Sequence, residues 1–308
     1  MTAISVVIPT RGRPDLIGRS VESVLANDHR DFEVIVVDQS DGGETAAVVR
    51  RIAEHDGRLR YVHLSPAGLS RAYNLGANLA TAPLLAFTDD DCVARADWVS
   101  AIARAFREEP DADMLYGDVA LPRSLHGASG IVPTLPMPRA RLDRRNGFRI
   151  YGMGANFALR RAFLERIGGF DEMLGGGGPL RSSQDFDLQY RAYLADAVVL
   201  LRPEVSVDHY GLRTDEQWPA TMRAYLFGNG AFYMKHIRCG DLRAARMLVR
   251  SLAWMSARQA RHLVDRRRPS NMPFIGAILG GARESLRYPV DRSRRVYLEP
   301  DDRMRRVA

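Results

Sequence analysis

The sequence predicts an α/β fold with a mostly parallel sheet flanked by helices, followed by a helical C-terminal extension. Short runs of β-branched residues alternate with amphipathic helical patterns through the first half of the chain, which is typical of such a sheet. Beyond about residue 216 the strand signals stop, and the remainder combines helical patterns with many arginines. A chain of 308 residues is long enough for one substantial core and a smaller second unit.

Each element follows from its own pattern. A buried strand is predicted over residues 5–8, and a helix begins at Pro14, where the missing N–H of proline costs nothing. The same alternation continues along the chain. Further strands are predicted at 32–37, 59–64 and 84–88, helices at 44–53, 69–79, 161–167 and 183–194, a long loop at 122–149, and a strand pair at 198–201 and 205–208.

Composition excludes several classes of protein. The apolar and charged fractions are those of an ordinary globular chain, and the two cysteines, Cys92 and Cys239, cannot form a disulfide framework or a zinc cluster. With no leader pattern before the first strand and no apolar run long enough for a bilayer, we expect a cytoplasmic protein. The formal charge is +7, Lys235 is the only lysine, and the basic excess lies towards the C-terminal end. It includes Arg243, Arg246, Arg250, Arg258, Arg261, Arg266, Arg267, Arg268, Arg292, Arg294 and Arg295.

Polar residues follow three of the predicted strands. They are Pro9, Thr10 and Arg11 after the first strand, Asp38 after the second, and the run 89–91 after the fourth. Because ligands of open α/β sheets bind outside the carboxyl ends of the strands, we expect these residues to converge on one cleft.

The run Asp89-Asp90-Asp91 is the sharpest chemical feature. Three consecutive carboxylates repel one another unless a cation neutralises them, and oxygen ligands suit Mg²⁺ or Mn²⁺ shared with substrate phosphates. The alternative interpretation is a solvated acidic turn that caps a helix starting near Ala96.

Two further positions carry candidate chemistry. Asp185 follows Gln184 at the start of a predicted helix, after a glycine-rich loop at 175–178, where a carboxylate is stabilised as the anion and could act as a general base. His209 ends the last predicted strand and could serve as a third metal ligand. Taken alone, each residue is better explained by a structural role, Asp185 as a helix cap and His209 as a hydrogen-bonded histidine.

Taken in order, these segments resemble the family 2 glycosyltransferases with the GT-A fold. The resemblance covers about residues 4–211 and rests on seven motifs in the family's order. These are Val6-Val7-Ile8-Pro9-Thr10, Val36-Val37-Asp38, Gly68-Leu69-Ser70 with Asn74 and Gly76, Phe87-Thr88-Asp89-Asp90-Asp91, Gly154-Ala155-Asn156, Gly168-Gly169-Phe170-Asp171-Glu172, and Gln184-Asp185 through Arg191.

The resemblance implies a domain division and a set of roles. A GT-A catalytic domain would span 1–215, with a donor-binding half at about 1–120 and an acceptor and base half at about 121–215, followed by an Arg-rich helical extension at 216–308. Nucleotide binding would fall to Pro9, Thr10, Arg11, Asp38, Arg71, Asn74, Asp89 and Asp90. The metal, Mg²⁺ or Mn²⁺, would be held by Asp91, Asp89 and His209. Asn156 and Gln184 would contact the donor sugar or the acceptor. Asp185 would be the general base of an inverting reaction.

Three positions depart from the family pattern. Arg11 stands where an aromatic residue is common, so stacking on the nucleobase would fall to a guanidinium or be absent. Tyr73 stands where many relatives have arginine, and Arg71 is the neighbouring substitute for that diphosphate contact. Gln184 replaces the usual glutamate before the base.

The implied reaction moves a sugar from a nucleotide-diphosphate donor of the UDP, GDP or dTDP type to a hydroxyl of a glycan, lipid-linked or small-molecule acceptor. A donor-binding protein without turnover, or a nucleotidyltransferase with the same fold, is the nearer alternative. Nucleic-acid binding, suggested by the basic C-terminal region, is the distant one, and no nucleic-acid partner is expected.

The C-terminal region allows two interpretations. From Asp241 onward, Leu242, Ala245, Leu248, Leu252 and Met255 recur at helical spacing, with arginines largely on the other face and Trp254 beside them. Such a helix either lies on an anionic membrane surface, which would place the enzyme peripherally on the inner face of the plasma membrane, or packs its apolar face on the catalytic domain.

Overall fold

The computed structural model describes residues 3–264 and 272–300, so the predicted basic cluster at Arg266, Arg267 and Arg268 lies outside the described residues. The chain divides into two compact units, which we describe separately. Unit 1 consists of Met1–Ala67, Arg71–Gly169 and Leu188–Thr214, and unit 2 of Gly68–Ser70, Phe170–Asp187 and Asp215–Ala308. The segment Phe170–Asp187 thus belongs to the same unit as the C-terminal helices. The division into a catalytic domain at 1–215 and an extension at 216–308 stays a prediction.

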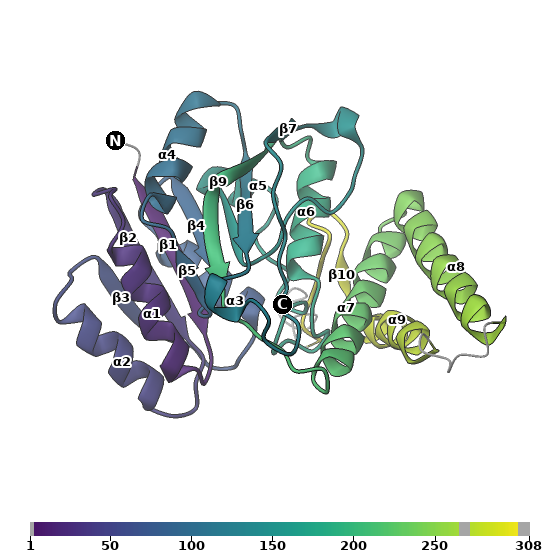
Figure 1. The fold of residues 1–308 in the computed structure, drawn as a ribbon. Helices are drawn as coiled ribbons and strands as arrows, with labels where there is room; N and C mark the ends of the chain where they lie inside the picture. The colour runs from purple at the N-terminus through teal and green to yellow at the C-terminus, as the bar shows by residue number, and fades with distance from the viewer. Residues whose placement is uncertain (1–2, 265–271, 301–308) are drawn as a thin grey trace. The chain divides into compact units, whose positions relative to one another are not determined.

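Unit 1 is built on one mixed sheet (Figure 1). Its strand order is β3-β2-β1-β4-β8-β6-β9-β5, and β7 pairs with β9. The first four strands of this order are mutually parallel, and β8 joins them antiparallel to β4. The strands are β1 (Ile4–Thr10), β2 (Phe32–Asp38), β3 (Leu59–His63), β4 (Leu84–Thr88), β5 (Cys92–Ala94), β6 (Met114–Ala120), β7 (Ala140–Leu142), β8 (Asn156–Arg160) and β9 (Val199–His209).

The helices of unit 1 lie on both faces of the sheet. They are α1 (Pro14–Leu25), α2 (Glu44–Ala53), the greater part of α3 (Leu69–Leu79), α4 (Trp98–Glu108), α5 (Arg161–Arg166) and the greater part of α6 (Gln184–Leu194). The predicted α/β class, a mostly parallel sheet flanked by helices, is confirmed by this arrangement. Helix α1 begins at Pro14 as expected, and α2, α3 and β2 match their predicted ranges within a residue.

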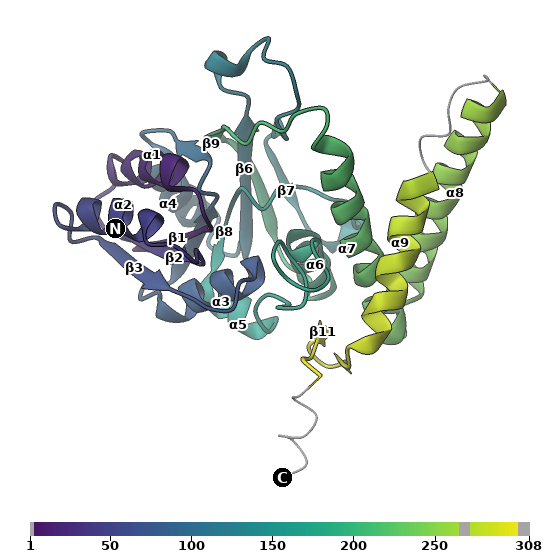
Figure 2. The ribbon, with the colours of Figure 1, turned by 90° about the horizontal axis from the view of Figure 1, so that it is seen from below.

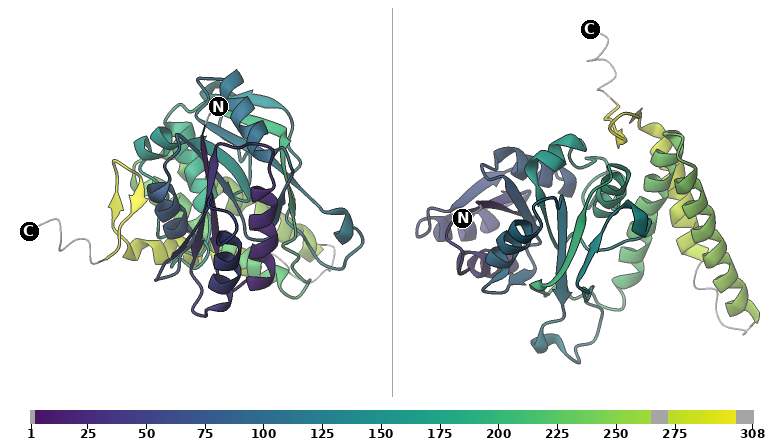
Figure 3. Two further views of the ribbon diagram at one scale, coloured as in Figure 1. Left: turned by 90° about the vertical axis from the view of Figure 1, so that its left-hand side faces the viewer. Right: turned by 90° about the horizontal axis from the view of Figure 1, so that it is seen from above.

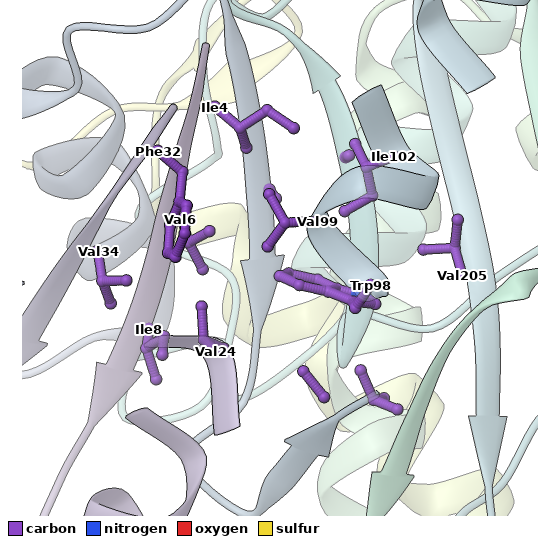
Figure 4. Packing of buried hydrophobic residues seen from close by; sticks show 14 of the residues in the cluster. Ile4, Val6, Ile8, Val24, Phe32, Val34, Trp98, Val99, Ile102 and Val205 are labelled. Carbon is purple, nitrogen blue, oxygen red and sulfur yellow. The ribbon is translucent and has the colours of Figure 1, made fainter. Parts of the chain in front are cut away.

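The main core lies between the sheet and α1, α2 and α4. Ile4, Val6 and Ile8 alternate along β1 and point to the same face as the even-numbered residues of β2, because side chains two apart share one face of a strand. Figure 4 shows these residues converging with Trp98, Val99 and Ile102 of α4. Trp98 is fully buried, and its indole N–H donates to Asn156 Oδ1 at 2.9 Å.

Helix α3 packs closely against the opposite face of β1. A Cβ at Gly76 would collide with the side chain of Val7, so only glycine lets this helix approach the strand. Tyr73, one turn earlier, packs edge-on against Phe87 of β4 at 5.2 Å between ring centroids. The close approach fixes the start of α3 near the carboxyl ends of the strands.

The structure corrects the prediction in the second half of unit 1. The predicted strand pair at 198–201 and 205–208 is one continuous strand, β9. Its pairing with β6 shifts in register on either side of the segment that contains Pro203, so the strand continues past the proline. Residues 122–149 are not a plain loop, because they contain β7 and two 3-10 turns, η1 (Arg123–Leu125) and η2 (Arg144–Asn146). The strands β5 and β6 were not predicted: β5 is too short to show a period, and β6 contains Gly117 and Asp118.

Unit 2 consists mainly of three helices, α7 (Trp218–Arg238), α8 (Leu242–Val264) and α9 (Met272–Glu284). Figure 2 shows α8 and α9 running beside one another. Glycines let α7 and α9 meet, because a Cβ at Gly230 or Gly281 would collide with the backbone of the other helix. After η3 (Ser285–Arg287), the strands β10 (Val290–Asp291) and β11 (Val296–Tyr297) form a small hairpin (Figure 3) that the sequence did not predict.

The apolar stripe predicted on α8 is used largely inside unit 2. Leu248, Leu252 and Met255 pack in a cluster with residues of α7 and α9, whereas Leu242 is 72% exposed. Within residues 3–264 and 272–300, no helix combines the length and the apolar character that crossing a membrane requires.

Candidate active site

The carboxyl ends of β1, β2 and β4 meet at one edge of the sheet, as the sequence predicted. Thr10 and Asp38 are direct partners in the register of β1 and β2. The Thr10 hydroxyl donates to Asp90 Oδ2 at 2.8 Å, which connects β1 to the acidic run after β4. These segments, far apart in the sequence, therefore form one continuous polar edge.

Asp38 is held as an acceptor at this edge. Its carboxylate accepts hydrogen bonds from the Ser40 backbone N–H at 2.9 Å and from the Tyr61 hydroxyl at 3.0 Å, and it is fully buried. These donors fix the orientation of the carboxylate. Arg11 behaves differently, since its side chain is half exposed and lies 3.8 Å from the exposed Asp41.

The acidic run is buried, and its carboxylates are not equivalent. Burial, together with the charges of Asp91 and Asp90, raises the pKa of Asp89 to about 7. Burial also raises the pKa of Asp90, although Arg13 opposes this effect. At Asp91 burial acts in the same direction, but His209 and Arg13 outweigh it and hold the pKa below its usual value. Asp91 is thus the carboxylate of the three that is best stabilised as an anion.

Arg13 supplies a positive charge that the sequence prediction missed. Its guanidinium lies 2.7 Å from Asp90 Oδ1 and 2.9 Å from Asp91 Oδ2. The residue precedes the first turn of α1 and thus points back over the end of β1. Its signal in the sequence is the run Thr10-Arg11-Gly12-Arg13-Pro14, in which a second arginine closely follows the first strand.

His209 lies against Asp91 through antiparallel pairing of β5 with β9, in which His209 is the partner of Cys92. His209 Nδ1 is 2.7 Å from the Pro133 carbonyl oxygen, which can only accept, so Nδ1 carries a proton. In the neutral imidazole Nε2 then has its lone pair free, as in metal-ligating histidines. Nε2 lies 3.2 Å from Asp91 Oδ1.

Asp91 Oδ1 is a buried oxygen that no hydrogen-bond donor satisfies in the described part of the chain. Burial lowers the pKa of His209, but the Asp91 carboxylate outweighs this effect and raises it. The Asp91 carboxylate and the His209 imidazole therefore favour one additional positive charge between them, which either a proton or a metal ion can supply. This is the arrangement expected of two ligands of one cation.

Gly211 leaves room at these two ligand atoms. A Cβ at this position would lie 2.6 Å from His209 Nε2 and 2.7 Å from Asp91 Oδ2. The backbone after β9 therefore passes directly beside the Asp91–His209 pair, and only hydrogen occupies that side of Gly211. The sequence prediction missed this glycine because its role depends on a contact across the sheet.

The residues present fit a divalent cation. Asp91, Cys92 and His209 each offer a ligand atom, and these atoms lie within 4.8 Å of one another. Burial raises the pKa of the Cys92 thiol well above its usual range, so Asp91 and His209 are the better ligands for Mg²⁺ or Mn²⁺. Asp89 instead lies 3.3 Å from the Tyr73 hydroxyl, and its predicted place on the metal stays a prediction.

The other predicted site residues lie in different surroundings. Arg71 and Asn74 are half-buried on α3. Asn156 is fully buried, accepts from Trp98 and donates to two carbonyl oxygens, which favours a structural role; its contact with a sugar stays a prediction. Gln184 and Asp185 form the first turn of α6, on the part that belongs to unit 2, and Asp185 Oδ1 accepts from the Phe186 N–H at 2.8 Å.

Comparison with known proteins decides the family. The model of "Glycosyl transferase family 2" matches residues 5–168, which is more than half of the chain. This chain belongs to glycosyl transferase family 2. The resemblance drawn from its motifs is thereby confirmed.

Several curated relatives of this family 2 chain are named as glycosyltransferases. It is 30% identical over 220 residues to a validoxylamine A glucosyltransferase of Streptomyces hygroscopicus subsp. jinggangensis, covering 62% of this chain and 51% of the relative. It is 26% identical over 183 residues to a glucosyl-dolichyl phosphate glucuronosyltransferase of Haloferax volcanii, covering 57% and 58%. The chain thus matches about half the length of these relatives.

Solved structures show that the family 2 chain has the GT-A fold. A mannosyltransferase from Pyrobaculum calidifontis in complex with GDP-Man and Mn²⁺ has a TM-score of 0.60 at 19% identity, covering 92% of this chain and 86% of that one. S. aureus TarS in complex with UDP has a TM-score of 0.56 at 21% identity, covering 74% and 65%. The predicted fold family is therefore confirmed.

Proposed function

We propose that this protein transfers a sugar from a nucleotide-diphosphate donor to an acceptor hydroxyl, with inversion at the anomeric carbon. The proposal is carried by the Asp91–His209 pair, with its unsatisfied buried oxygen and its oriented imidazole, beside the space at Gly211. Family membership and the nucleotide-bound neighbours support a nucleotide-sugar donor.

The residues of the polar edge have distinct parts in this proposal. Thr10 and Asp38 hold the nucleoside at the ends of β1 and β2. A divalent cation held by Asp91 and His209 stabilises the negative charge of a diphosphate leaving group. Arg13 pairs with Asp90 and Asp91 and neutralises part of their negative charge, so it competes with the cation for these carboxylates.

Asp185 is the proposed general base. It lies in the first turn of α6, where the positive end of the helix dipole favours the carboxylate form. It takes the proton of the acceptor hydroxyl as that oxygen attacks the anomeric carbon from the face opposite the leaving group. A single displacement of this kind inverts the configuration.

The test is product analysis with a panel of UDP, GDP and dTDP sugars, with Mn²⁺ or Mg²⁺ and simple glycan acceptors. Glycosyl transfer releases a nucleoside diphosphate and gives a product of the opposite anomeric configuration, which NMR detects. Release of pyrophosphate would instead identify a nucleotidyltransferase. Binding of a donor without any product in the full acceptor panel would contradict the enzyme proposal.

Peripheral association with the inner face of the plasma membrane is a separate part of the proposal. Helix α8 contains no Asp or Glu within 242–264 but has five arginines there, which suits an anionic lipid surface. Val249 and Trp254 are 64% and 60% exposed, and these apolar side chains, not the packed stripe, would enter the interface.

Flotation with anionic vesicles tests the membrane proposal. The wild type is expected to float with vesicles that contain phosphatidylserine, and the double variant Val249→Ser with Trp254→Ser to lose most of that binding. Leu286→Ser, an exposed residue outside α8, is the matched control. Equal flotation of the wild type and the double variant, or none by the wild type, removes the membrane proposal.

A further inference from the structure

The only lysine of the sequence is completely buried. Lys235 lies on α7 with no exposed surface, and its Nζ is 2.6 Å from Asp171 Oδ2 and 2.6 Å from Asp187 Oδ1. Long charged side chains are almost never fully buried unless they are paired. This chain uses arginine elsewhere, and a compact ammonium group is the cation that fits between two facing carboxylates.

The cluster connects four separate segments of unit 2. Asp171 also accepts from the backbone N–H of Tyr297 on the C-terminal hairpin at 2.9 Å. Asp187 Oδ1 lies 3.0 Å from His236 Nε2, the residue next to Lys235. The ammonium group thus holds the segment after Gly169 and the first turn of α6 against α7.

Stability alone is a weak explanation for this cluster. Burying three charged groups has a large desolvation cost, which ion pairs roughly offset, and well-packed apolar residues of similar volume are often as stable. A buried charge network does, however, fix one arrangement of the groups that it joins. The segment fixed here is the first turn of α6, in which Asp187 is two residues from Asp185.

We propose that Lys235 is a positioning residue for Asp185, acting through Asp187. By fixing the first turn of α6, it sets the direction in which the half-buried Asp185 carboxylate points. This inference rests on the proposed role of Asp185 as the base. It makes α7, a helix of the C-terminal extension, necessary for the chemical step and not only for anchoring.

The two carboxylates provide an internal comparison. Asp171 and Asp187 are equally buried and equally close to Lys235, so a purely structural network predicts similar effects of Asp171→Asn and Asp187→Asn. A positioning role predicts an asymmetry, because only Asp187 belongs to the turn that carries Asp185. We expect Asp187→Asn to have a kcat at least tenfold below that of Asp171→Asn, with similar donor KM values.

Lys235→Met and Arg238→Met complete the experiment. Arg238 lies on the same helix and donates to the carbonyls of Ser285 and Tyr288, away from α6. Lys235→Met should lose kcat at least tenfold, and Arg238→Met should keep it within threefold, at a temperature where circular dichroism shows both folded. If Lys235→Met does not fold, the Asp171 and Asp187 variants decide.

The outcomes separate this proposal from the proposed function. Equal kcat values for the Asp171 and Asp187 variants overturn the positioning role, even if Asp185→Asn is inactive. Wild-type turnover by Asp185→Asn instead overturns the base assignment itself.

A second inference rests on an independent feature, a cavity of about 540 Å³ in unit 1. Its polar lining comes from Arg19 on α1, Arg95 after β5, Arg123 and His126 near η1, and Asp208 and Tyr210 at the end of β9. The volume is in the range of small-molecule sites.

The charges of this cavity favour an anion. Arg19 stacks on the Tyr210 ring at 3.9 Å and donates to its hydroxyl at 2.6 Å, which fixes both side chains. Within the described residues, neither Arg95 nor Arg123 forms an ion pair with a carboxylate. Asp208 is the single acidic residue of the lining and can accept hydrogen bonds from hydroxyl groups.

The cavity is distinct from the metal-ligand pair. Asp208 precedes His209 on β9, and successive side chains of a strand point to opposite faces, so the lining lies across the strand from His209 Nε2. We infer that this cavity binds a phosphate-bearing saccharide, with Arg95 and Arg123 on the phosphate and Asp208 on sugar hydroxyls.

Calorimetry with glucose 1-phosphate, in the presence of saturating UDP and Mn²⁺ to fill a donor site, tests this inference. Binding should be at least tenfold tighter than that of glucose, and at least tenfold weaker in Arg95→Gln with Arg123→Gln. Arg51→Gln with Arg104→Gln is the charge-matched control and should bind as the wild type does. Absent binding, equal binding by both double variants, or equal affinity for inorganic phosphate overturns the inference of a saccharide site.

Discussion

Adding one methyl group at Gly211 should remove metal binding while leaving the fold intact. In Gly211→Ala the new carbon would lie 2.6 Å from His209 Nε2 and 2.7 Å from Asp91 Oδ2, both closer than real Cβ atoms approach. Gly211 is not among the glycines with positive φ, so alanine can adopt its backbone conformation. The two side chains must therefore move apart by several tenths of an ångström.

Metal sites respond strongly to such shifts. Disturbing the groups that orient ligands weakens metal affinity by about 10- to 100-fold, or roughly 1.4–2.8 kcal/mol. We expect at least this loss in Gly211→Ala, measured as the Mn²⁺ concentration that gives half-maximal thermal stabilisation and half-maximal nucleoside diphosphate release. Gly57→Ala is the control, because a Cβ at Gly57 meets nothing within 4 Å. An unchanged Mn²⁺ dependence in Gly211→Ala would refute the placement of the cation at Asp91 and His209.

Three further predictions test the site and its support. Asp185→Asn should abolish transfer while donor binding, measured by calorimetry, stays within a few-fold of wild type; turnover at the normal rate would contradict its role as base. Arg13→Gln leaves Asp90 and Asp91 without their guanidinium partner, so Mn²⁺ should raise its melting temperature more than that of the wild type; an equal or smaller rise counts against the shared charge. Burial lowers the pKa of His236 to about 4 from an ordinary value of 6.5, so this histidine is protonated more readily in the unfolded state than in the folded state. The free energy of unfolding should therefore fall as the pH decreases from about 6.5 towards 4, with a slope of at most about 1.4 kcal/mol per pH unit. His236→Gln should show a shallower loss over that window in chemical denaturation, and parallel curves would exclude this histidine as the source.

The donor side of the fold could be predicted because its signals are local. The strand at Ile4–Thr10 has a continuous apolar run, Pro14 marks the start of its helix, and the acidic run at 89–91 follows the strand that carries it. Parallel order then brings their carboxyl ends to one edge. The contact of Thr10 with Asp90 follows directly from this arrangement.

The remaining features depend on contacts between distant segments. Nothing near Gly211 indicates that its missing side chain makes room for Asp91 and His209, because the three meet only when β5 pairs with β9. The burial of Lys235 was hidden for the same reason, since a lysine near the end of a helix ordinarily lies in water. A helical period also cannot show which elements the apolar side of α8 packs against, which here are α7 and α9.

Because Lys235 is fully buried, its chemical modification can report when the interior around α7 becomes exposed to solvent. Reagents that acylate primary amines find no accessible side-chain amine in the described structure, since arginine does not react under the same conditions and the chain has no second lysine. Each molecule that acquires an internal acyl group must therefore have exposed the interior of α7 at least once. Peptide mass spectrometry over time, which distinguishes acylation of Lys235 from acylation of the α-amino group, would measure how often that opening occurs.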